Sequence, residues 1–513
     1  MNTVKYYISL LNMDRNEKKF ILSSKNLAKN QSRKKKSTIL ISMISDYYYL
    51  CYLHSIYNQN LKNFNLLGYW PHIVPSEQKS HNKFHNLLKK VVHYLIKRKW
   101  TILYSSLGIK KIIDPNNLDS NYLNLNRQQN NRAKKIFTNL KEKKDILKIY
   151  VKGLYIGDLV YDTYIRFRNE PTVDINDKFL LKIITKSIIF KDIFKKISKK
   201  IDFFYTPFSS YINHGLPARV FLKNKVKVIT DGNYQYNKKL SLNDYNHVEN
   251  YKNYRKDFKK IENKTKAIGL SKKFINNYFF NSNKKSIYTY MKKNLFSKKS
   301  KSIFKNLDGV IFLPNFYETQ REWGEIAFND FYEWIFFTLN LIEKHKLRIA
   351  LKPHPNINTI NKESIAVINQ IKHKYPNIRW LDADESNAKI FNSINFGIST
   401  WGSVLWELAY FKKISICMGS HPGKFYNFSY DAKNKKEYEK LIINANKLKN
   451  KNYSLKDIYE YIYMYMLREN DNFTTTAREL KLKQIDFSTS GGIQYYLNKL
   501  YRHEFAKKNL SNC

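Results

Sequence analysis

The chain has 513 residues, of which 43% are hydrophobic, and it carries 40 tyrosines, 32 phenylalanines and a formal net charge of +49. This composition excludes a disordered chain, and the length exceeds what one hydrophobic core supports, so we expect two domains. Three cysteines, Cys51, Cys417 and Cys513, are too few and too far apart for a disulfide framework or a zinc site.

The positive charge is spread along the whole chain. An excess of 91 basic over 42 acidic side chains suggests nucleic acid or an anionic membrane surface as a partner. Only short basic clusters occur, however, at Arg33–Lys36 and Lys298–Lys301, whereas a nucleic-acid-binding module concentrates its charge. We therefore expect solvated basic faces and no nucleic-acid partner, with some attraction for phosphorylated donors or anionic lipid head groups.

The sequence predicts neither a signal peptide nor a membrane span. The first residues lack the basic-then-apolar order of a signal peptide, and no apolar run reaches the roughly 18 residues of a transmembrane helix. We expect a cytoplasmic protein, with peripheral association at the inner face of the cell membrane as a further expectation.

Strands and helices alternate in the first half. Residues 1–36 are interpreted as a loosely ordered basic lead-in. The next predicted elements are a strand at 38–44, an aromatic helix through 57, a basic amphipathic helix at 87–99, a strand, turn and helix at 146–166, and a strand, helix and strand at 203–229. This alternation predicts a mostly parallel sheet covered on both faces. The domain is assigned to 37–300.

The second half has the clearer pattern. Apolar strands are predicted at 308–314, 347–352, 377–381, 395–399 and 414–419, separated by helical patterns that include 329–345 and 403–411. Such an order predicts a doubly wound α/β domain, assigned to 301–455. A helical tail, 456–513, is expected to pack back on the first domain.

Two segments follow predicted strands of this second domain, where ligands of open parallel sheets bind. In KPHP, 352–355, two prolines hold His354 where an imidazole can donate to a phosphate or a leaving oxygen. In STWGSVLWELAYFKK, 399–413, small residues begin a helix whose free N–H groups favour an anion. Taken singly, each segment also has a purely structural interpretation. His354 could cap a turn, Ser403 could be only a helix N-cap, and Glu407 could be only a solvated glutamate.

Taken together, the segments resemble the nucleotide-binding domain of bacterial capsule and surface-polysaccharide glycosyltransferases with the GT-B fold. The resemblance runs over 310–428, through VIFLPNFYETQREWGEIAFNDFYEWIFFTL, KPHPN, STWGSVLWELAYFKK and MGSHPGKFYNF, and more loosely through GLYIGDLVYDTYIRF and HGLPAR in the first half. Similar His-Pro and Ser/Thr-rich elements occur in bacterial sialyltransferases, Kdo transferases and teichoic-acid glycerophosphotransferases, where they hold the nucleotide and its phosphate.

The resemblance implies two Rossmann-like domains facing a cleft, with the donor on the C-terminal domain and the acceptor on the N-terminal domain. It implies that Lys352 and His354 lie at the donor phosphate, that Thr400, Gly402 and Ser403 form the phosphate-binding turn, and that Glu407 holds the ribose. Trp401 departs from the pattern, because a smaller residue is expected there. His421, in a second His-Pro pair, is a further candidate for lining the site.

The N-terminal half offers candidates for the catalytic base. Asp158 and Asp162 are four residues apart and share a helix face with Arg166 one turn further, so one carboxylate could deprotonate an acceptor hydroxyl. An N-cap at Asp158 and an Asp162–Arg166 surface pair are the plainer alternative. His214 and Arg219 in NHGLPAR could reach the cleft, or serve the structure only.

The sequence therefore predicts an enzyme, a glycosyltransferase that moves a sugar from a nucleotide-activated donor to a growing glycan or lipid-linked glycan of the cell envelope, such as capsule polysaccharide. No metal or other cofactor is expected, since helix N-termini and basic side chains can neutralise the phosphate. The alternatives are a transferase of polyol phosphate from a CDP-linked donor, and a non-catalytic basic protein that binds nucleic acid or a membrane.

Overall fold

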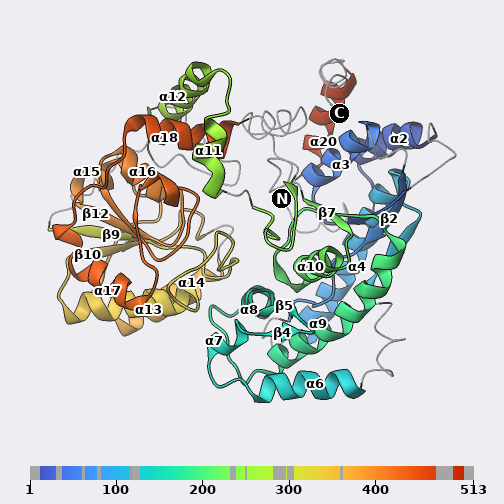
Figure 1. Cartoon of the computed structure of the whole chain (residues 1–513), viewed down its shortest axis with the longest axis horizontal. Helices are drawn as coiled ribbons and strands as arrows, with labels where there is room; N and C mark the ends of the chain where they lie inside the picture. Colours follow the sequence, from blue (N-terminus) through green and yellow to red (C-terminus); the bar gives the residue numbers. More distant parts are fainter. Residues whose placement is uncertain are drawn as a thin grey trace. The chain divides into compact units, whose positions relative to one another are not determined.

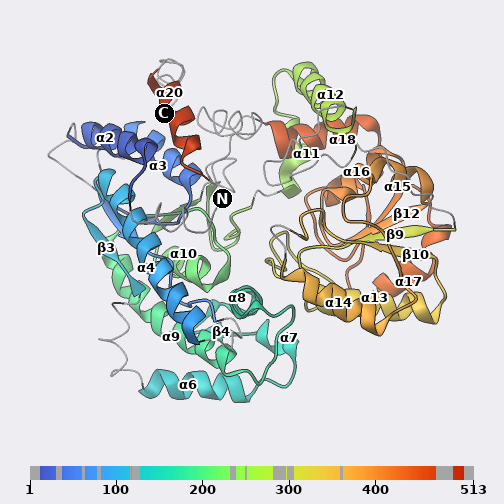
Figure 2. The same cartoon turned by 180° about the vertical axis from the view of Figure 1, so that it is seen from behind.

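The computed structural model describes two compact units (Figures 1 and 2). It describes residues 12–29, 37–59, 64–77, 83–115, 117, 127–230, 238–248, 251–280, 296, 306–358, 362–468 and 489–501. The N-terminal unit comprises 1–168, 175–247 and 469–513, and the C-terminal unit comprises 169–174 and 248–468.

The N-terminal unit is built on a six-stranded sheet of order β3-β2-β1-β6-β7-β8. Its strands are β1 (Ser37–Ser42), β2 (Phe64–Tyr69), β3 (Lys111–Ile113), β6 (Phe203–Thr206), β7 (Lys227–Thr230) and β8 (Lys238–Lys239). All pairs are parallel except β7 with β8. In chain order this is the 3-2-1-4-5-6 arrangement of the Rossmann fold.

Alternate side chains along each strand point to opposite faces of this sheet, and a layer of helices covers each face. Ile39 and Ile41 of β1 belong to a core formed with α2 (Arg15–Lys29), α3 (Tyr47–Gln59), α4 (Lys83–Ser106) and α20 (Gly491–Tyr501). On the other face, Phe204 of β6 packs against Phe221 of α10 (Leu216–Lys223), which in turn contacts Phe194 of α9 (Lys178–Ile197). The sheet is therefore covered on both sides, as its apolar strands require.

The remaining elements of this unit are short. They are α6 (Arg127–Thr138), α7 (Lys143–Ile146), the antiparallel pair β4 (Tyr150–Val151) and β5 (Leu154–Tyr155), and α8 (Gly157–Tyr164). The pair β4-β5 turns at Lys152 and Gly153, which have φ values of 49° and 72°. The predicted strand and turn after residue 146 are therefore present, but the two short strands form a separate hairpin and not part of the main sheet.

The C-terminal unit repeats the same strand order with all strands parallel, β11-β10-β9-β12-β13-β14. The strands are β9 (Gly309–Phe312), β10 (Ile349–Lys352), β11 (Arg379–Trp380), β12 (Phe396–Ser399), β13 (Ile414–Cys417) and β14 (Tyr430–Asp431). Figure 1 shows α13 (Phe331–Lys344), α14 (Ser364–Lys374) and α17 (Lys435–Ile443) on one side of the sheet and α15 (Asn387–Ser393) and α16 (Val404–Tyr410) on the other. The prediction of two Rossmann-like domains is confirmed.

An aromatic layer covers α16 in the C-terminal unit. It brings together side chains of α11 (Tyr254–Phe258), α12 (Lys264–Phe280) and α18 (Leu455–Ile462). Residues 251–280 therefore belong with the C-terminal unit, whereas the sequence assigned them to the first domain; the expected boundary at 300 itself lies outside the described residues. The final helix, α20, packs in the N-terminal core, so the expected return to the first domain is confirmed for this part of the tail, whereas residues 456–468 belong to the C-terminal unit.

The lead-in was predicted wrongly over residues 15–29. These residues form α2, whose Phe20 is buried in the N-terminal core and whose Glu17 is buried beside Lys99 at 2.7 Å. The basic stretch at 33–36 lies outside the described residues. Among the helices that the structure describes, none combines the length and the apolar composition that crossing a bilayer requires.

Candidate functional site

The switch point of the C-terminal sheet lies between β9 and β12, where the strand order reverses. β9 pairs in parallel with β10 on one side and with β12 on the other, so all three strands end at the same edge. The KPHP segment leaves this edge after β10, and the STWGS segment leaves it after β12. The structure therefore places the two predicted ligand-binding elements at the same edge, on either side of β9.

Lys352 is the last residue of β10 and is 2% exposed. Its ammonium donates to the Ala383 carbonyl at 3.1 Å. Burial lowers the pKa of Lys352 to about 8, and the carboxylates of Glu407 and Glu385 act against this shift. A positive charge is thus kept at this edge at neutral pH, at the first residue of the KPHP segment.

His354 is half-buried and presents a defined tautomer. The Asn356 amide donates to its Nδ1 at 3.1 Å, which leaves the proton of the neutral imidazole on Nε2. Burial and the neighbouring Lys352 lower the pKa of His354 to about 4, so the ring is neutral at pH 7. His354 can therefore donate one hydrogen bond from Nε2 without bringing a charge.

Ser403 and Glu407, predicted for phosphate and ribose, contact each other in the structure. The Ser403 hydroxyl donates to Glu407 Oε1 at 2.7 Å instead of capping α16. Glu407 is 2% exposed, so it is not the solvated glutamate of the plainer interpretation. Its Oε1 also accepts from the Tyr278 hydroxyl at 2.7 Å, and burial raises its pKa while these hydrogen bonds and Lys352 oppose that shift.

Gly402 lies in the turn before α16 without any conformational or steric need for glycine. A Cβ atom at this position would have its closest contact, 3.5 Å, with Ser399 Oγ, and the φ angle is not in the left-handed region. Glycine here thus fits a close approach from outside the protein. The ring of Trp401, next to it, lies 6.2 Å from that of Phe331 and 6.4 Å from that of Trp323.

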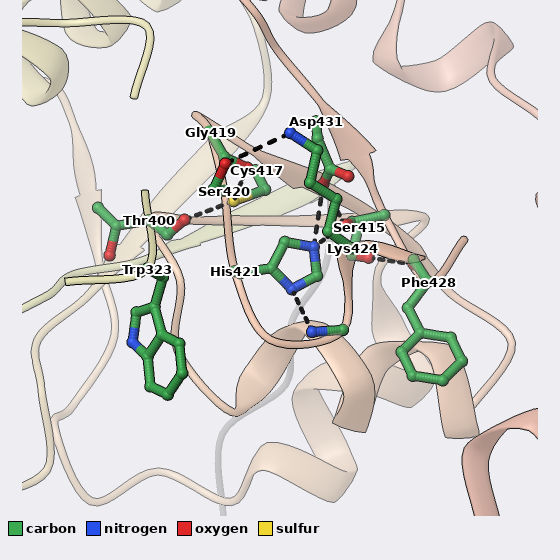
Figure 3. A network of polar contacts seen from close by, with 12 residues as sticks. Trp323, Thr400, Ser415, Cys417, Gly419, Ser420, His421, Lys424, Phe428 and Asp431 are labelled. Carbon is green, nitrogen blue, oxygen red and sulfur yellow. Dashed lines mark hydrogen bonds and ion pairs between the residues drawn. The ribbon is translucent and has the colours of Figure 1, made fainter. Parts of the chain in front are cut away.

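His421 is held inside the loop that follows β13 (Figure 3). The Gly423 amide donates to Nδ1 at 3.2 Å, so Nε2 carries the proton and faces Asp431 Oδ1 at 3.0 Å and Ser429 Oγ at 2.7 Å. The side chain is 3% exposed. Both ring nitrogens are used within the loop, which favours a structural role for His421.

Cys417, His421 and Asp431 have the donor types of a metal site, and their ligand atoms lie within 4.8 Å of one another. The protonation pattern does not fit a metal, because His421 Nδ1 accepts a backbone hydrogen bond and Nε2 therefore has no lone pair to offer. The Cys417 thiol donates to the Thr400 carbonyl, and burial raises its pKa. We assign no metal to this cluster. The expectation that the reaction needs no metal remains a prediction.

In the N-terminal unit, Asp158 forms a bidentate ion pair with Arg219 at 2.6 and 2.7 Å. Arg219 also donates to the Tyr155 carbonyl and stacks on Tyr245, 4.0 Å from the ring centroid. The pair joins α8 to α10, so both residues have structural roles here. Asp162, one turn further along α8, is 4% exposed.

His214 lies elsewhere, at the carboxyl edge of the N-terminal sheet. Its Nδ1 is 3.4 Å from the hydroxyls of Ser42 and Thr206, the last residues of β1 and β6. The sequence interpretation missed both hydroxyls. A usable signal was present, because each is a polar residue that ends an apolar strand, as Ser399 does in the other unit.

No protein-family model and no curated protein matches the chain. Among solved structures, UDP-GlcNAc 2-epimerase from Neisseria meningitidis bound to UDP-GlcNAc is 8% identical, over 88% of this chain and 99% of that chain, with a TM-score of 0.21. Anabaena Alr3699/HepE in complex with UDP and glucose is 8% identical, over 91% and 100%, with a TM-score of 0.24. The wall teichoic acid polymerase TagF is 10% identical, over 94% and 97%, with a TM-score of 0.22. These values are too low to assign a family, so the fold assignment depends on the strand orders and the function on the site.

Proposed function

We propose that the chain is a glycosyltransferase that binds a nucleotide-activated sugar on its C-terminal unit and transfers the sugar to a cell-envelope glycan. The observation that carries the proposal is the convergence of KPHP and STWGS at the switch point of a Rossmann-type sheet. Lys352 and Glu407 interact electrostatically across this point, which ties the two segments to one place.

The chemistry of the edge suits a nucleoside diphosphate. Negative charge develops on the diphosphate as the sugar leaves, and fixed donors or cations placed there lower the barrier. Lys352 supplies a buried positive charge, and His354 supplies a neutral Nε2–H donor. Because Gly402 has no side chain, a phosphate can approach its backbone closely.

Ser403 and Glu407 act in this proposal as a pair. With its proton committed to Glu407, Ser403 offers only lone pairs to a ligand, so it suits a ribose hydroxyl better than a phosphate. Glu407 then positions Ser403 and compensates Lys352. Thr400 remains a candidate for the phosphate turn.

The N-terminal unit is proposed to bind the acceptor. One of its side chains takes the proton of the attacking hydroxyl, the hydroxyl oxygen bonds to the anomeric carbon, and the bond to the diphosphate breaks with its electron pair on the nucleotide. No metal or other cofactor enters this scheme. A peripheral position at the inner face of the cell membrane and the absence of a nucleic-acid partner belong to the same proposal.

Thermal unfolding in the presence of UDP, CMP, CDP or GDP tests the proposal. A nucleotide that binds the folded chain raises the melting temperature as its concentration exceeds its dissociation constant. We expect one of the four to do so, and His354→Ala to weaken the shift while His373→Ala, an exposed histidine on α14, retains it. No shift with any of them would overturn the assignment. The polyol phosphate transferase would be favoured if CDP raised the melting temperature most and if the chain consumed a CDP-linked polyol phosphate without transferring any sugar.

A further inference from the structure

The N-terminal sheet has its own switch point, between β1 and β6. These strands end at Ser42 and Thr206, and both hydroxyls lie 3.4 Å from His214 Nδ1. The His214 imidazole thus lies at the carboxyl edge of this sheet, where ligands of open parallel sheets bind. It lies in the turn of helix at Tyr211–Gly215 that leads into α10.

The hydrogen bonds of Thr206 indicate which nitrogen of His214 is protonated. The Thr206 hydroxyl donates its only proton to the Phe208 carbonyl at 2.9 Å. Its contact with His214 Nδ1 therefore requires a proton on Nδ1, which leaves the lone pair of the neutral ring on Nε2. Within the part of the chain that the structure describes, Nε2 has no hydrogen-bond partner.

The backbone around His214 is held firmly. Asn213 exchanges two side-chain hydrogen bonds with the backbone of Val74, at 2.8 and 3.1 Å, and its carbonyl accepts from the Tyr69 hydroxyl at 2.8 Å. The Ile212 amide donates to the Thr163 hydroxyl at 2.8 Å. A ring on such a support keeps its orientation, as a group that must meet a reacting hydroxyl does.

The surroundings keep His214 neutral. Burial, followed by the nearby His72 and His247, lowers its pKa to about 3. His72 in turn adjoins His93, Lys97 and Asp114. The two ionisable groups that interact with His214 among the described residues, His72 and His247, both oppose its protonation.

We infer that His214 is the catalytic base of the proposed transfer: Nε2 accepts the hydrogen bond of the attacking acceptor hydroxyl and then its proton. This role rests on the proposed function and replaces Asp158, whose carboxylate is committed to Arg219. The acceptor is a hydroxyl-bearing glycan. As its oxygen bonds to the anomeric carbon and the diphosphate departs with the electron pair of the broken bond, the proton moves to Nε2, and the resulting imidazolium releases it to solvent.

Thr206 and Ser42 are positioning residues in this scheme. Thr206 accepts from Nδ1–H, so it directs the lone pair outward and stabilises the imidazolium when it forms. Thr206→Val removes this acceptor with little change of shape, and Thr206→Ser keeps it. We expect Thr206→Val to lower kcat with little effect on KM for the donor, and Thr206→Ser to keep kcat near the wild-type value. If Thr206 had only a structural role, kcat would not depend on whether the side chain carries a hydroxyl.

The test of His214 is the consumption of a labelled nucleotide sugar, chosen by the nucleotide that raises the melting temperature, in the presence of a cell-envelope extract and water as acceptors. His214→Ala is expected to slow consumption by about a hundredfold or more, as for other general bases, with an unchanged nucleotide-induced shift. His93→Ala, at an exposed histidine whose ring packs against that of His72, serves as the control.

The outcomes separate the two proposals. Consumption by His214→Ala at the wild-type rate, with nucleotide binding intact, overturns the role of His214 and leaves the proposed function standing. A wild-type chain that binds no nucleotide overturns the proposed function and this role with it. If His214→Ala fails to fold, carbethoxylation of the wild type by diethyl pyrocarbonate decides: an open Nε2 lone pair predicts a modified His214 in the folded chain, and an unmodified one contradicts the inference.

Discussion

Lys352 at the end of β10 and Glu407 on α16 stabilise each other's charges although 54 residues separate them in the chain. Both side chains are 2% exposed. A buried charge is costly without a partner, so this pair makes the positions of the two segments depend on one another. Because Lys352 belongs to the KPHP segment and Glu407 to the segment that begins with STWGS, the same interaction that stabilises the fold also fixes the proposed donor site.

Glu407→Ala should destabilise the C-terminal unit. The substitution leaves the Tyr278 hydroxyl without its acceptor and removes the carboxylate that contributes most to compensating the charge of Lys352. Breaking such a buried arrangement costs about 3 kcal/mol in the free energy of unfolding, which urea titration measures. Glu343→Ala, an exposed glutamate on α13, is the control. Equal stability of the two variants would contradict the described role of Glu407.

Two glycines should respond oppositely to alanine. At Gly397 in β12 a Cβ atom would lie 2.5 Å from Leu408 Cδ1, so Gly397→Ala should cost about 1–3 kcal/mol of stability. At Gly402 the closest contact would be 3.5 Å, so Gly402→Ala should melt as the wild type does but lose much of the nucleotide-induced shift. If Gly402→Ala kept the full nucleotide-induced shift, the turn at Gly402 would not be part of the nucleotide-binding site.

Acidification should weaken the fold because several buried histidines resist protonation in the folded state. Burial lowers the pKa values of His54, His72 and His354 to about 4 and that of His214 to about 3. In the unfolded chain these groups titrate near the usual value of about 6.5, so the unfolded state binds more protons below that pH. Stability is complete above pH 6.5 and decreases as the pH falls toward 4. Urea midpoints that agree at pH 7.5 and pH 5 would contradict these pKa values.

The ion pair of Asp158 and Arg219 should matter to folding. Side chains of 20% and 5% exposure joined by two hydrogen bonds are only partly screened by solvent, so Asp158→Ala should cost about 2 kcal/mol. The nucleotide-induced shift in melting temperature should remain, because the pair lies in the other unit. An unaltered stability together with lost turnover would return Asp158 to the role of base.

The C-terminal strands could be predicted because parallel strands buried on both faces appear as continuous apolar runs. The KPHP and STWGS segments were found by the same route, since each follows such a run. The helix α9 carries an apolar pattern typical of a buried helix, with Ile183, Ile184 and Ile188 fully or almost fully buried, yet it was not among the predicted elements.

Other features depend on contacts between distant residues. Burial of Glu17 in α2 requires Lys99 as a partner, and nothing in the local sequence indicates that pair. Short polar strands such as β8 and β14 exist through pairing with a neighbour and carry no apolar run. The tautomers of His214 and His354 follow from hydrogen bonds to Thr206 and Asn356, which only the structure reveals.

Backbone hydrogen exchange, followed by mass spectrometry with and without the nucleotide that stabilises the chain, tests the central claim most directly. The account predicts that the nucleotide slows exchange in 352–357 and 399–405 together, because both segments hold the same diphosphate. Protection of one segment alone, or protection confined to other parts of the chain, would contradict it.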